Sequence, residues 1–204
     1  MSEFDEKARE WDKNRMHLDR TIAIAAHLQN MVDLKPGMKA LEFGAGTGLL
    51  SFYLKDMFSA ITLMDSSQEM LNMAEQKMDE ADRSKFRTIY FDLEKENFTV
   101  EPFDILYSQM VLHHIRDTEA IFGKFYNLLS PGGILAIADL YQEDGSFHDG
   151  DVNVHHGFDP ENLKDMIVKT GFSEVKISSC FVIRKLTSEG STAEYPVFLL
   201  TARK

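Results

Sequence analysis

Short apolar runs alternate with longer stretches whose apolar residues recur at helical spacing through the middle of the chain. The runs predict strands at 39–44, 60–64, 86–91, 103–107 and 133–139, and the stretches predict helices at 48–57, 67–80 and 117–129. Strands separated by helices of this length are typical of βαβ units with parallel strands. Right-handed crossovers then place helices on both faces of the sheet.

The pattern differs at the two ends of the chain. Residues 3–33 predict helix, which Pro36 and Gly37 end. Beyond residue 140, a polar segment at 141–157 predicts a surface loop.

A further helix begins at Asp159 and Pro160 and ends at Gly171, because proline suits a first helical turn and glycine a C-terminal cap. Two extended segments follow, at 174–186 and 194–202. Their link is too short for a crossover, so they pair antiparallel.

These elements predict one α/β domain with a doubly wound, mostly parallel seven-stranded sheet that ends in an antiparallel hairpin. A length of 204 residues suits a single domain. We divide it into an N-terminal helical cap (1–36), a cofactor-binding core (37–140), and a final part with the lid loop, helix and hairpin (141–204).

Three glycines at alternate positions follow the first strand: Gly44, Gly46 and Gly48. Glycine tolerates positive φ and has no Cβ, so they allow a tight strand-to-helix turn that a ligand can approach. The second strand ends in Asp65, whose carboxylate can accept both hydroxyls of a ribose. The two signals together predict a nucleoside cofactor.

The formal net charge is −11, and lysine and arginine are scattered, so we expect no nucleic-acid partner. The single cysteine, Cys180, fits a reducing compartment. No apolar run approaches the roughly 20 residues of a membrane helix, and the first residues contain no secretory signal. We therefore expect a cytoplasmic protein without a membrane partner, of unknown oligomeric state.

The motifs resemble, in order and spacing, those of class I S-adenosylmethionine-dependent methyltransferases, and the resemblance covers essentially the whole chain. The segments that carry it are 41–48 (Leu-Glu-Phe-Gly-Ala-Gly-Thr-Gly), 64–67 (Met-Asp-Ser-Ser), 91–93, 103–108, 111–115 (Val-Leu-His-His-Ile) and 128–133. The 111–115 run is similar to the ubiquinone/menaquinone-type, small-molecule branch. The resemblance implies S-adenosylmethionine as cofactor and a small-molecule methyl acceptor.

The resemblance also implies roles for the cofactor-binding residues. The glycine turn contacts the methionine end, Glu42 faces its ammonium, Asp65 binds the ribose, and Asp92 and Leu93 bind the adenine. The full predicted set is Glu42, Gly44, Ala45, Gly46, Gly48, Asp65, Ser66, Met70, Asp92, Leu93 and Ser108. Ordinary structural roles stay open: a tight turn, a helix N-cap at 65–67, a solvated acid at Asp92, and core packing at Met70.

The candidate catalytic residues are Gln109, His113 and His156, with His114 a weaker candidate. Histidine can remove a proton from an acceptor near neutral pH. The Asn-Pro-Pro-aromatic signature of amino-directed DNA and protein methyltransferases is absent. Trp11, His17 and His155 are predicted to close over the acceptor, although Trp11 also suits a core position.

The polar segment offers metal-ligand residue types in His148, Asp149, Asp151, His155 and His156. Their spacing matches no established ligand pattern. The sequence therefore predicts no metal.

Two other functions remain open. An NAD-dependent oxidoreductase is disfavoured because Leu49 stands where Gly-x-Gly-x-x-Gly needs glycine or alanine, and no Tyr-x-x-x-Lys pair follows. A non-catalytic S-adenosylmethionine-binding regulator stays possible, because methyl transfer requires no diagnostic side chain.

Overall fold

The computed structural model describes residues 8, 10–148, 154–186 and 191–204. It contains one seven-stranded sheet with the strand order β3-β2-β1-β4-β5-β7-β6. The strands are β1 (Lys39–Phe43), β2 (Ala60–Asp65), β3 (Phe86–Tyr90), β4 (Phe103–Gln109), β5 (Leu129–Leu140), β6 (Ser173–Leu186) and β7 (Thr192–Arg203). The first five strands are parallel and β7 is antiparallel to both its neighbours, which confirms the predicted fold class.

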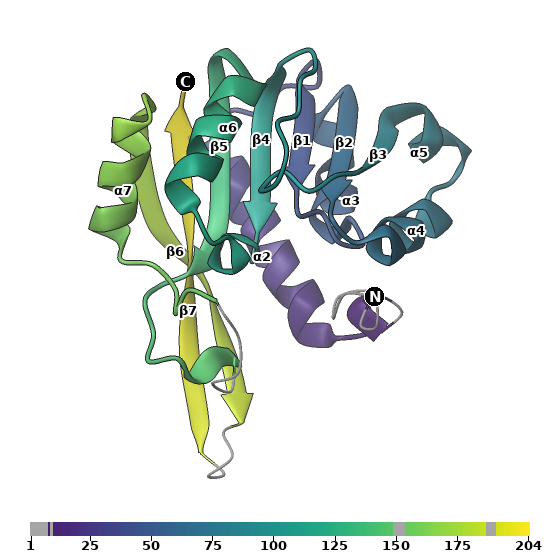
Figure 1. The fold of residues 1–204 in the computed structure, drawn as a ribbon. Helices are drawn as coiled ribbons and strands as arrows, with labels where there is room; N and C mark the ends of the chain where they lie inside the picture. The colour runs from purple at the N-terminus through teal and green to yellow at the C-terminus, as the bar shows by residue number, and fades with distance from the viewer. Residues whose placement is uncertain (1–7, 9, 149–153, 187–190) are drawn as a thin grey trace.

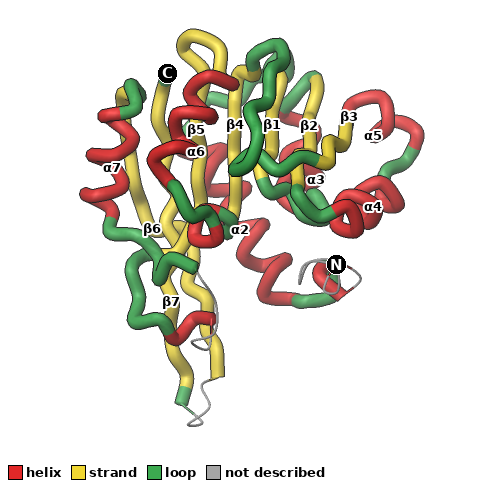
Figure 2. Tube along the Cα trace, in the orientation of Figure 1, coloured by secondary structure: helices red, strands yellow, loops and turns green. Residues whose placement is uncertain are grey.

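Helices cover both faces of the sheet (Figure 1 and Figure 2). The helices are α2 (Arg15–Met31), α3 (Leu49–Leu54), α4 (Gln68–Lys77), α5 (Glu80–Lys85), α6 (Thr118–Leu128) and α7 (Pro160–Lys169). Ile24 of α2, Leu50 of α3 and Leu71 of α4 belong to one buried apolar cluster. Phe122 of α6 and Ile167 of α7 belong to another. The sheet therefore separates two hydrophobic cores, as βαβ crossovers require.

The long N-terminal helix predicted from the sequence is interrupted. Helix α2 begins only at Arg15, because the Asn14 side chain accepts a hydrogen bond from the Met16 N–H and caps it. The preceding residue Asp12 instead accepts from the Thr47 hydroxyl at 2.5 Å and from Lys77 Nζ at 2.6 Å. These contacts hold the segment before α2 against the glycine turn and α4.

The predicted helix at 67–80 is also divided. Helix α4 ends at Lys77, and Asp79 caps the N-terminus of α5 by accepting from the Asp82 N–H at 2.8 Å. Helix α5 was not predicted, since its six residues are too short for a clear apolar period.

The polar segment after β5 lies along the sheet's extended end. A short 3-10 helix, η3 (Ser146–His148), forms within it, and a bridge between Tyr141 and Phe158 closes it at the base. Residues 149–153 lie outside the described part. Beside it, β6 and β7 extend well beyond the other strands (Figure 1).

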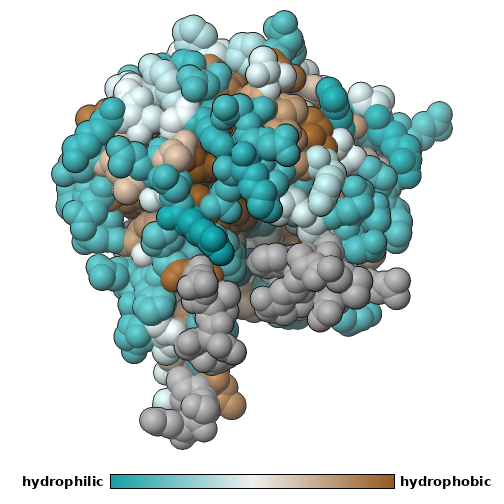
Figure 3. Space-filling view, in the orientation of Figure 1, coloured by the Kyte–Doolittle hydropathy of each residue, from teal (hydrophilic) through white to brown (hydrophobic). Residues whose placement is uncertain are grey.

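Hydrophilic side chains predominate on the face of the molecule seen in Figure 3, with smaller apolar areas between them. Among the described helices, none is both long and apolar enough to cross a membrane.

We predict opposite effects for two glycine substitutions. Gly157 has φ 68°, and a Cβ there would lie 2.1 Å from the Tyr141 carbonyl oxygen, so Gly157→Ala should lower the free energy of unfolding by about 2 kcal/mol or more. Gly123 lies inside α6, and a methyl group added there would meet no atom within 4 Å, so Gly123→Ala should raise it by about 0.5–1 kcal/mol. Urea denaturation measures both. Equal denaturation midpoints for Gly157→Ala and the parent chain would contradict the first expectation.

Candidate functional site

A cavity of about 820 Å³ lies at the carboxyl ends of the parallel strands. Its walls come from the segments that follow β1, β2, β3 and β4, from the start of α2, and from η3. Open α/β sheets bind ligands at this edge, and the volume suits a ligand of cofactor size with room for a second molecule.

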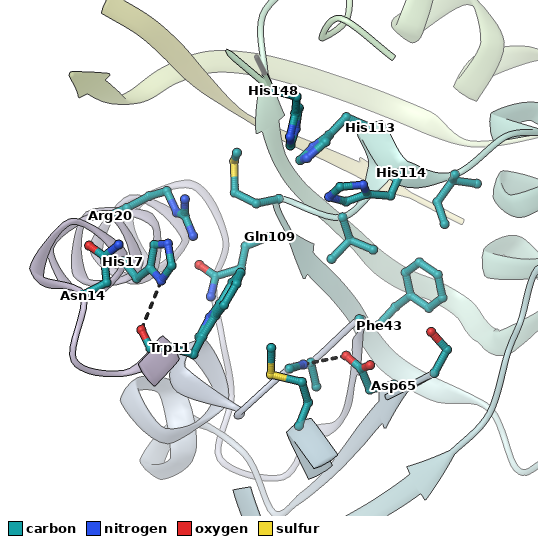
Figure 4. A pocket seen from close by; sticks show the side chains of 18 of the residues that line it. Trp11, Asn14, His17, Arg20, Phe43, Asp65, Gln109, His113, His114 and His148 are labelled. Carbon is teal, nitrogen blue, oxygen red and sulfur yellow. Dashed lines mark hydrogen bonds between the residues drawn. The ribbon is translucent and has the colours of Figure 1, made fainter. Parts of the chain in front are cut away.

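One end of the cavity is built around Asp65 and the glycine turn (Figure 4). Asp65 Oδ2 accepts from the Gly46 N–H and Oδ1 from the Ser67 N–H, each at 2.7 Å. Gly44 has φ 63°, and a Cβ there would lie 2.5 Å from Val111 Cγ2, so the turn requires glycine. The carboxylate fixes the turn, and each of its oxygens can accept more than one hydrogen bond.

The wall beside this end comes from the segments after β2 and β3. Ser66, Met70, Asp92 and Leu93 all line the cavity, and their contact with the cofactor stays a prediction. Asp92 accepts from Lys95 Nζ at 2.6 Å. Burial alone would raise the pKa of Asp92, but its hydrogen bonds with Lys95 outweigh this and hold the pKa below its usual value. Asp92 is thus a carboxylate at neutral pH.

Glu42 and Ser108 lie behind the cavity wall, not in its lining. Glu42 is fully buried, and its Oε2 accepts from the Ser51 hydroxyl at 2.5 Å, while Oε1 has no hydrogen-bond partner among the described residues. Burial raises the pKa of Glu42 to about 8. The protonated form of Glu42 is therefore favoured at neutral pH, and its contact with the cofactor ammonium stays a prediction.

The other end of the cavity faces α2 (Figure 4). Arg20 is only 5% exposed, and its Nε has no hydrogen-bond partner among the described residues. Burial lowers the pKa of Arg20 to about 10, with Asp139 opposing the shift, so the guanidinium keeps its charge at neutral pH. One residue along, Thr21 donates a hydrogen bond to Gln109 Oε1 at 3.2 Å, which leaves the Gln109 amide nitrogen as a donor toward the cavity.

Trp11 and His17 close the α2 side. Their rings lie 4.3 Å apart between centroids, and His17 Nδ1 is 3.1 Å from the Trp11 carbonyl oxygen. Both residues line the cavity, and their closing over an acceptor stays a prediction.

Three imidazoles face α2 across the cavity. His113 and His114 belong to the 3-10 helix η2 (Leu112–His114), and His148 ends η3. His113 is 2% exposed, and its Nδ1 lies 2.7 Å from Oδ1 of the fully buried Asp139. Burial alone would raise the pKa of Asp139, but the electrostatic interaction with His113 and hydrogen bonds to the carboxylate hold it below its usual value. His113 is therefore fixed by a charged carboxylate.

The backbone changes direction sharply just before η2. Met110 has φ 56°, a left-handed conformation that residues other than glycine rarely adopt, and its N–H bonds the Ala138 carbonyl at 2.8 Å. Strain of this kind is found mainly where the surroundings hold a functional segment in place. Here it separates Gln109 at the end of β4 from the imidazoles of η2.

Three further predicted residues are not brought to the cavity lining. Gly48 caps α3 in a left-handed conformation. His155 is tied to η2, since its N–H donates to the His113 carbonyl and its Nε2 lies 2.8 Å from the Ile115 carbonyl oxygen. His156 is exposed, with its ring near Gly145, so the expected catalytic role has no support in the geometry. The segment reaches the cavity through Phe147 and His148 instead.

Sequence reasoning missed Arg20, Asp139 and Lys185. Arg20 stands four residues before Ile24 on the apolar face of α2, and Asp139 interrupts a buried apolar strand, so a charge at an apolar position was the available signal in both cases. Lys185 donates to the Phe147 carbonyl at 2.5 Å. Only the paired β6–β7 hairpin brings it there.

Known proteins are similar in sequence to the central part of this chain. Residues 41–135 match the family model described as "Methyltransferase domain". An uncharacterised methyltransferase of Schizosaccharomyces pombe is 30% identical over 160 residues, covering 70% of this chain and 56% of the relative. Phosphoethanolamine N-methyltransferase 3 of Arabidopsis thaliana is 31% identical over 155 residues, covering 72% and 31%. The chain thus spans about half and about a third of these relatives.

Solved structures agree on the fold. A chain in the complex between the Trm112 methyltransferase activator of Haloferax volcanii and its methyltransferase gives a TM-score of 0.79 at 17% identity, covering all of this chain and 98% of that one. Phosphoethanolamine N-methyltransferase 2 of Haemonchus contortus, with phosphomonomethylethanolamine and S-adenosylhomocysteine, gives 0.72 at 17% identity, covering 91% and 52%. The fold that the resemblance to class I methyltransferases implied is confirmed.

The buried Glu42 predicts a pH dependence of stability in the ligand-free chain. Because its pKa rises from 4.5 to about 8 on folding, it binds a proton more tightly when folded. The contribution of protonated Glu42 to the free energy of unfolding is fully present below about pH 4.5 and is lost as pH rises through about 8. Between pH 5 and 8 the parent chain should lose stability relative to Glu42→Gln, by about 1 kcal/mol per pH unit.

Urea denaturation at each pH measures this difference. Glu101→Gln changes an exposed carboxylate and serves as the matched control, whose profile should run parallel to that of the parent. A parallel profile for Glu42→Gln as well would show that Glu42 is not protonated in the folded chain.

Proposed function

We propose that this chain, whose fold and glycine-turn motif are those of class I methyltransferases, transfers a methyl group from S-adenosylmethionine to a small acidic acceptor. The observation that carries the proposal is a single cavity with two chemically different ends. One end has the glycine turn with Asp65 and Asp92, and the other has a buried arginine and three imidazoles.

The first end suits the nucleoside. The Asp65 oxygens can accept from ribose hydroxyls, and Leu93 and Met70 supply apolar contacts beside Asp92 for an adenine ring. The methionine part of the cofactor would lie along Gly44, Ala45 and Gly46, which line the cavity. This arrangement directs the sulfonium toward Gln109, at the centre of the cavity (Figure 4).

The second end suits an anion on the acceptor. Arg20 is buried and charged, and it forms no ion pair within 4 Å with a carboxylate of the described residues, in a chain of net charge −11. A buried cation of this kind is costly unless a ligand anion neutralises it. A phosphate or carboxylate of the acceptor would neutralise Arg20 by accepting two hydrogen bonds from its guanidinium group. The matched plant and nematode enzymes are named for a phosphate-bearing acceptor, which supports the same class here.

The chemistry is in-line displacement. The acceptor nucleophile forms a bond to the methyl carbon, the sulfur–methyl bond breaks, and its electron pair stays on sulfur to give S-adenosylhomocysteine. Alignment of the two reactants in the cavity supplies most of the acceleration, since proximity accounts for up to roughly 7–11 kcal/mol. Gln109 and His113 are proposed to contact the acceptor, whose proton leaves toward the imidazole end. We also propose a cytoplasmic location, supported by the single cysteine, Cys180, which is free.

The activity is tested by incubating the chain with methyl-labelled S-adenosylmethionine and a panel of small molecules. The panel pairs phosphoethanolamine and other phosphate- or carboxylate-bearing amines, phenols and thiols with their uncharged analogues. Label transfer to acidic members is expected. Tight cofactor binding without label transfer to any member would favour a regulatory binder.

Asp65→Asn should weaken S-adenosylmethionine binding by about 10–100-fold, because charged hydrogen bonds to the ribose are lost. Asp104→Asn is the matched control: its carboxylate accepts from the Lys39 N–H at the opposite edge of the sheet, so cofactor affinity should not change. Calorimetric titration measures both. Equal affinities for the two variants would remove Asp65 from the cofactor site.

Arg20→Gln should raise the KM for an acidic acceptor by about 10–100-fold and leave the KM for its uncharged analogue and the cofactor affinity unchanged. Arg15→Gln changes an exposed arginine on the same helix and should have no effect. Steady-state kinetics separates these cases. Equal increases for charged and uncharged acceptors would mean that Arg20 only supports the fold.

A further inference from the structure

The geometry points to a divalent transition-metal site formed by His113, His114 and His148 at the acceptor end of the cavity. One ligand nitrogen from each ring lies within 4.8 Å of the other two. Ring centroids lie 4.2 Å apart for His113 and His114, 5.0 Å for His113 and His148, and 5.3 Å for His114 and His148. The three rings converge from two segments that are distant in the sequence.

The ligand chemistry matches zinc and its neighbours in the first transition row. Three imidazoles with an open position are a known zinc arrangement, with zinc–nitrogen distances of about 2.0–2.1 Å. Tetrahedral geometry at that distance places ligand nitrogens roughly 3.3 Å apart, so side-chain rotation alone would complete the set. Magnesium and calcium are not suited, because they require oxygen ligands.

Asp139 supplies the outer support that such a ligand set needs. Its Oδ1 lies 2.7 Å from His113 Nδ1, and it also accepts from the backbone N–H groups of His113 and Leu140. A carboxylate that accepts from Nδ1–H fixes the tautomer with a lone pair on Nε2 and raises the basicity of the ring. A carboxyl group buried completely in a strand is costly unless hydrogen bonds satisfy its oxygens. The orientation of one imidazole accounts for it.

The scaffold around the three rings is also fixed. The His155 N–H donates to the His113 carbonyl at 2.8 Å and His155 Nε2 lies 2.8 Å from the Ile115 carbonyl oxygen, which binds the far end of the polar segment to η2. Lys185 Nζ donates a hydrogen bond to the carbonyl of Phe147, the residue before His148. Both segments that carry the imidazoles are therefore anchored independently of any ligand, as a preorganised site requires.

An ion here would face the cavity beside Arg20 and Gln109, since all these residues line it. Its open position would bind an oxygen or nitrogen of the acceptor and lower the pKa of that group, which prepares the nucleophile for methylation at neutral pH. His113 then acts on the acceptor through the ion, in place of a direct contact, and the proton of the acceptor leaves to solvent. This use of the ion depends on the proposed methyl transfer, whereas binding of the ion does not.

The site differs from the metal-ligand candidates in the sequence. Of those, only His148 takes part. His155 is bound to backbone, His156 is exposed outside the cavity, and Asp149 and Asp151 lie outside the described residues. The spacing of these residues in the sequence matched no metal-ligand pattern, because the ligands come from two distant segments, η2 and η3.

The test titrates the full chain, stripped with a chelator, with Zn²⁺ and Co²⁺. One ion per chain should bind, and Co²⁺ should give the visible absorption of a low-coordinate site. His148→Gln and His114→Gln should each weaken Zn²⁺ binding by about 100-fold, and Asp139→Asn by about 10–100-fold. His27→Gln is the matched control, because His27 contacts Ser178 and does not line the cavity. Its affinity should equal that of the parent.

The inference is overturned if the stripped parent chain takes up neither metal, or if His148→Gln and His27→Gln bind Zn²⁺ equally well. S-adenosylmethionine titration of the same samples shows that each variant is folded. It also separates the two proposals: loss of cofactor binding by the parent chain would contradict the proposed function alone, and loss of metal binding would contradict the metal site alone.

Discussion

The carboxylate of Asp65 joins the ends of the first two strands, and the geometry of the site depends on this junction. It accepts hydrogen bonds from the Gly46 N–H and the Ser67 N–H, each at 2.7 Å. It therefore fixes both the glycine turn and the residue before α4. Gly44 and Gly46 have positive φ and no Cβ, so a ligand can approach the backbone of the turn where both residues line the cavity. The parallel sheet then brings the ends of β3 and β4 alongside, and the cavity forms where these ends meet.

The two ends of this cavity differ in chemistry because different layers supply them. The sheet edge gives carboxylates and uncovered backbone. Helix α2, η2 after β4 and η3 after β5 give a cation and imidazoles, with Arg20 and His113 both buried. The antiparallel β7 lies between β5 and β6, where a dinucleotide-binding sheet continues parallel. A nucleoside at one end and a reacting partner at the other is therefore the arrangement that this topology favours.

Much of this was predictable from local sequence. The strands, α6 and α7, and the placement of Asp65, Asp92, Gln109 and His113 at strand ends follow from apolar period and motif order. The interruption of the N-terminal helix at Asn14 was not predictable, because a single capping side chain outweighs helical periodicity. Neither was the grouping of His148 with His113 and Asp139, nor the role of Arg20. These depend on tertiary contacts between segments whose separation in sequence carries no signal.

The most direct measurement is a crystal structure of the chain with S-adenosylhomocysteine. The account predicts electron density for the ribose within hydrogen-bond distance of Asp65, the adenine beside Asp92 and Leu93, and the sulfur facing Gln109. Density for the ligand at any other place, or a cavity without ligand at saturating concentration, would contradict it.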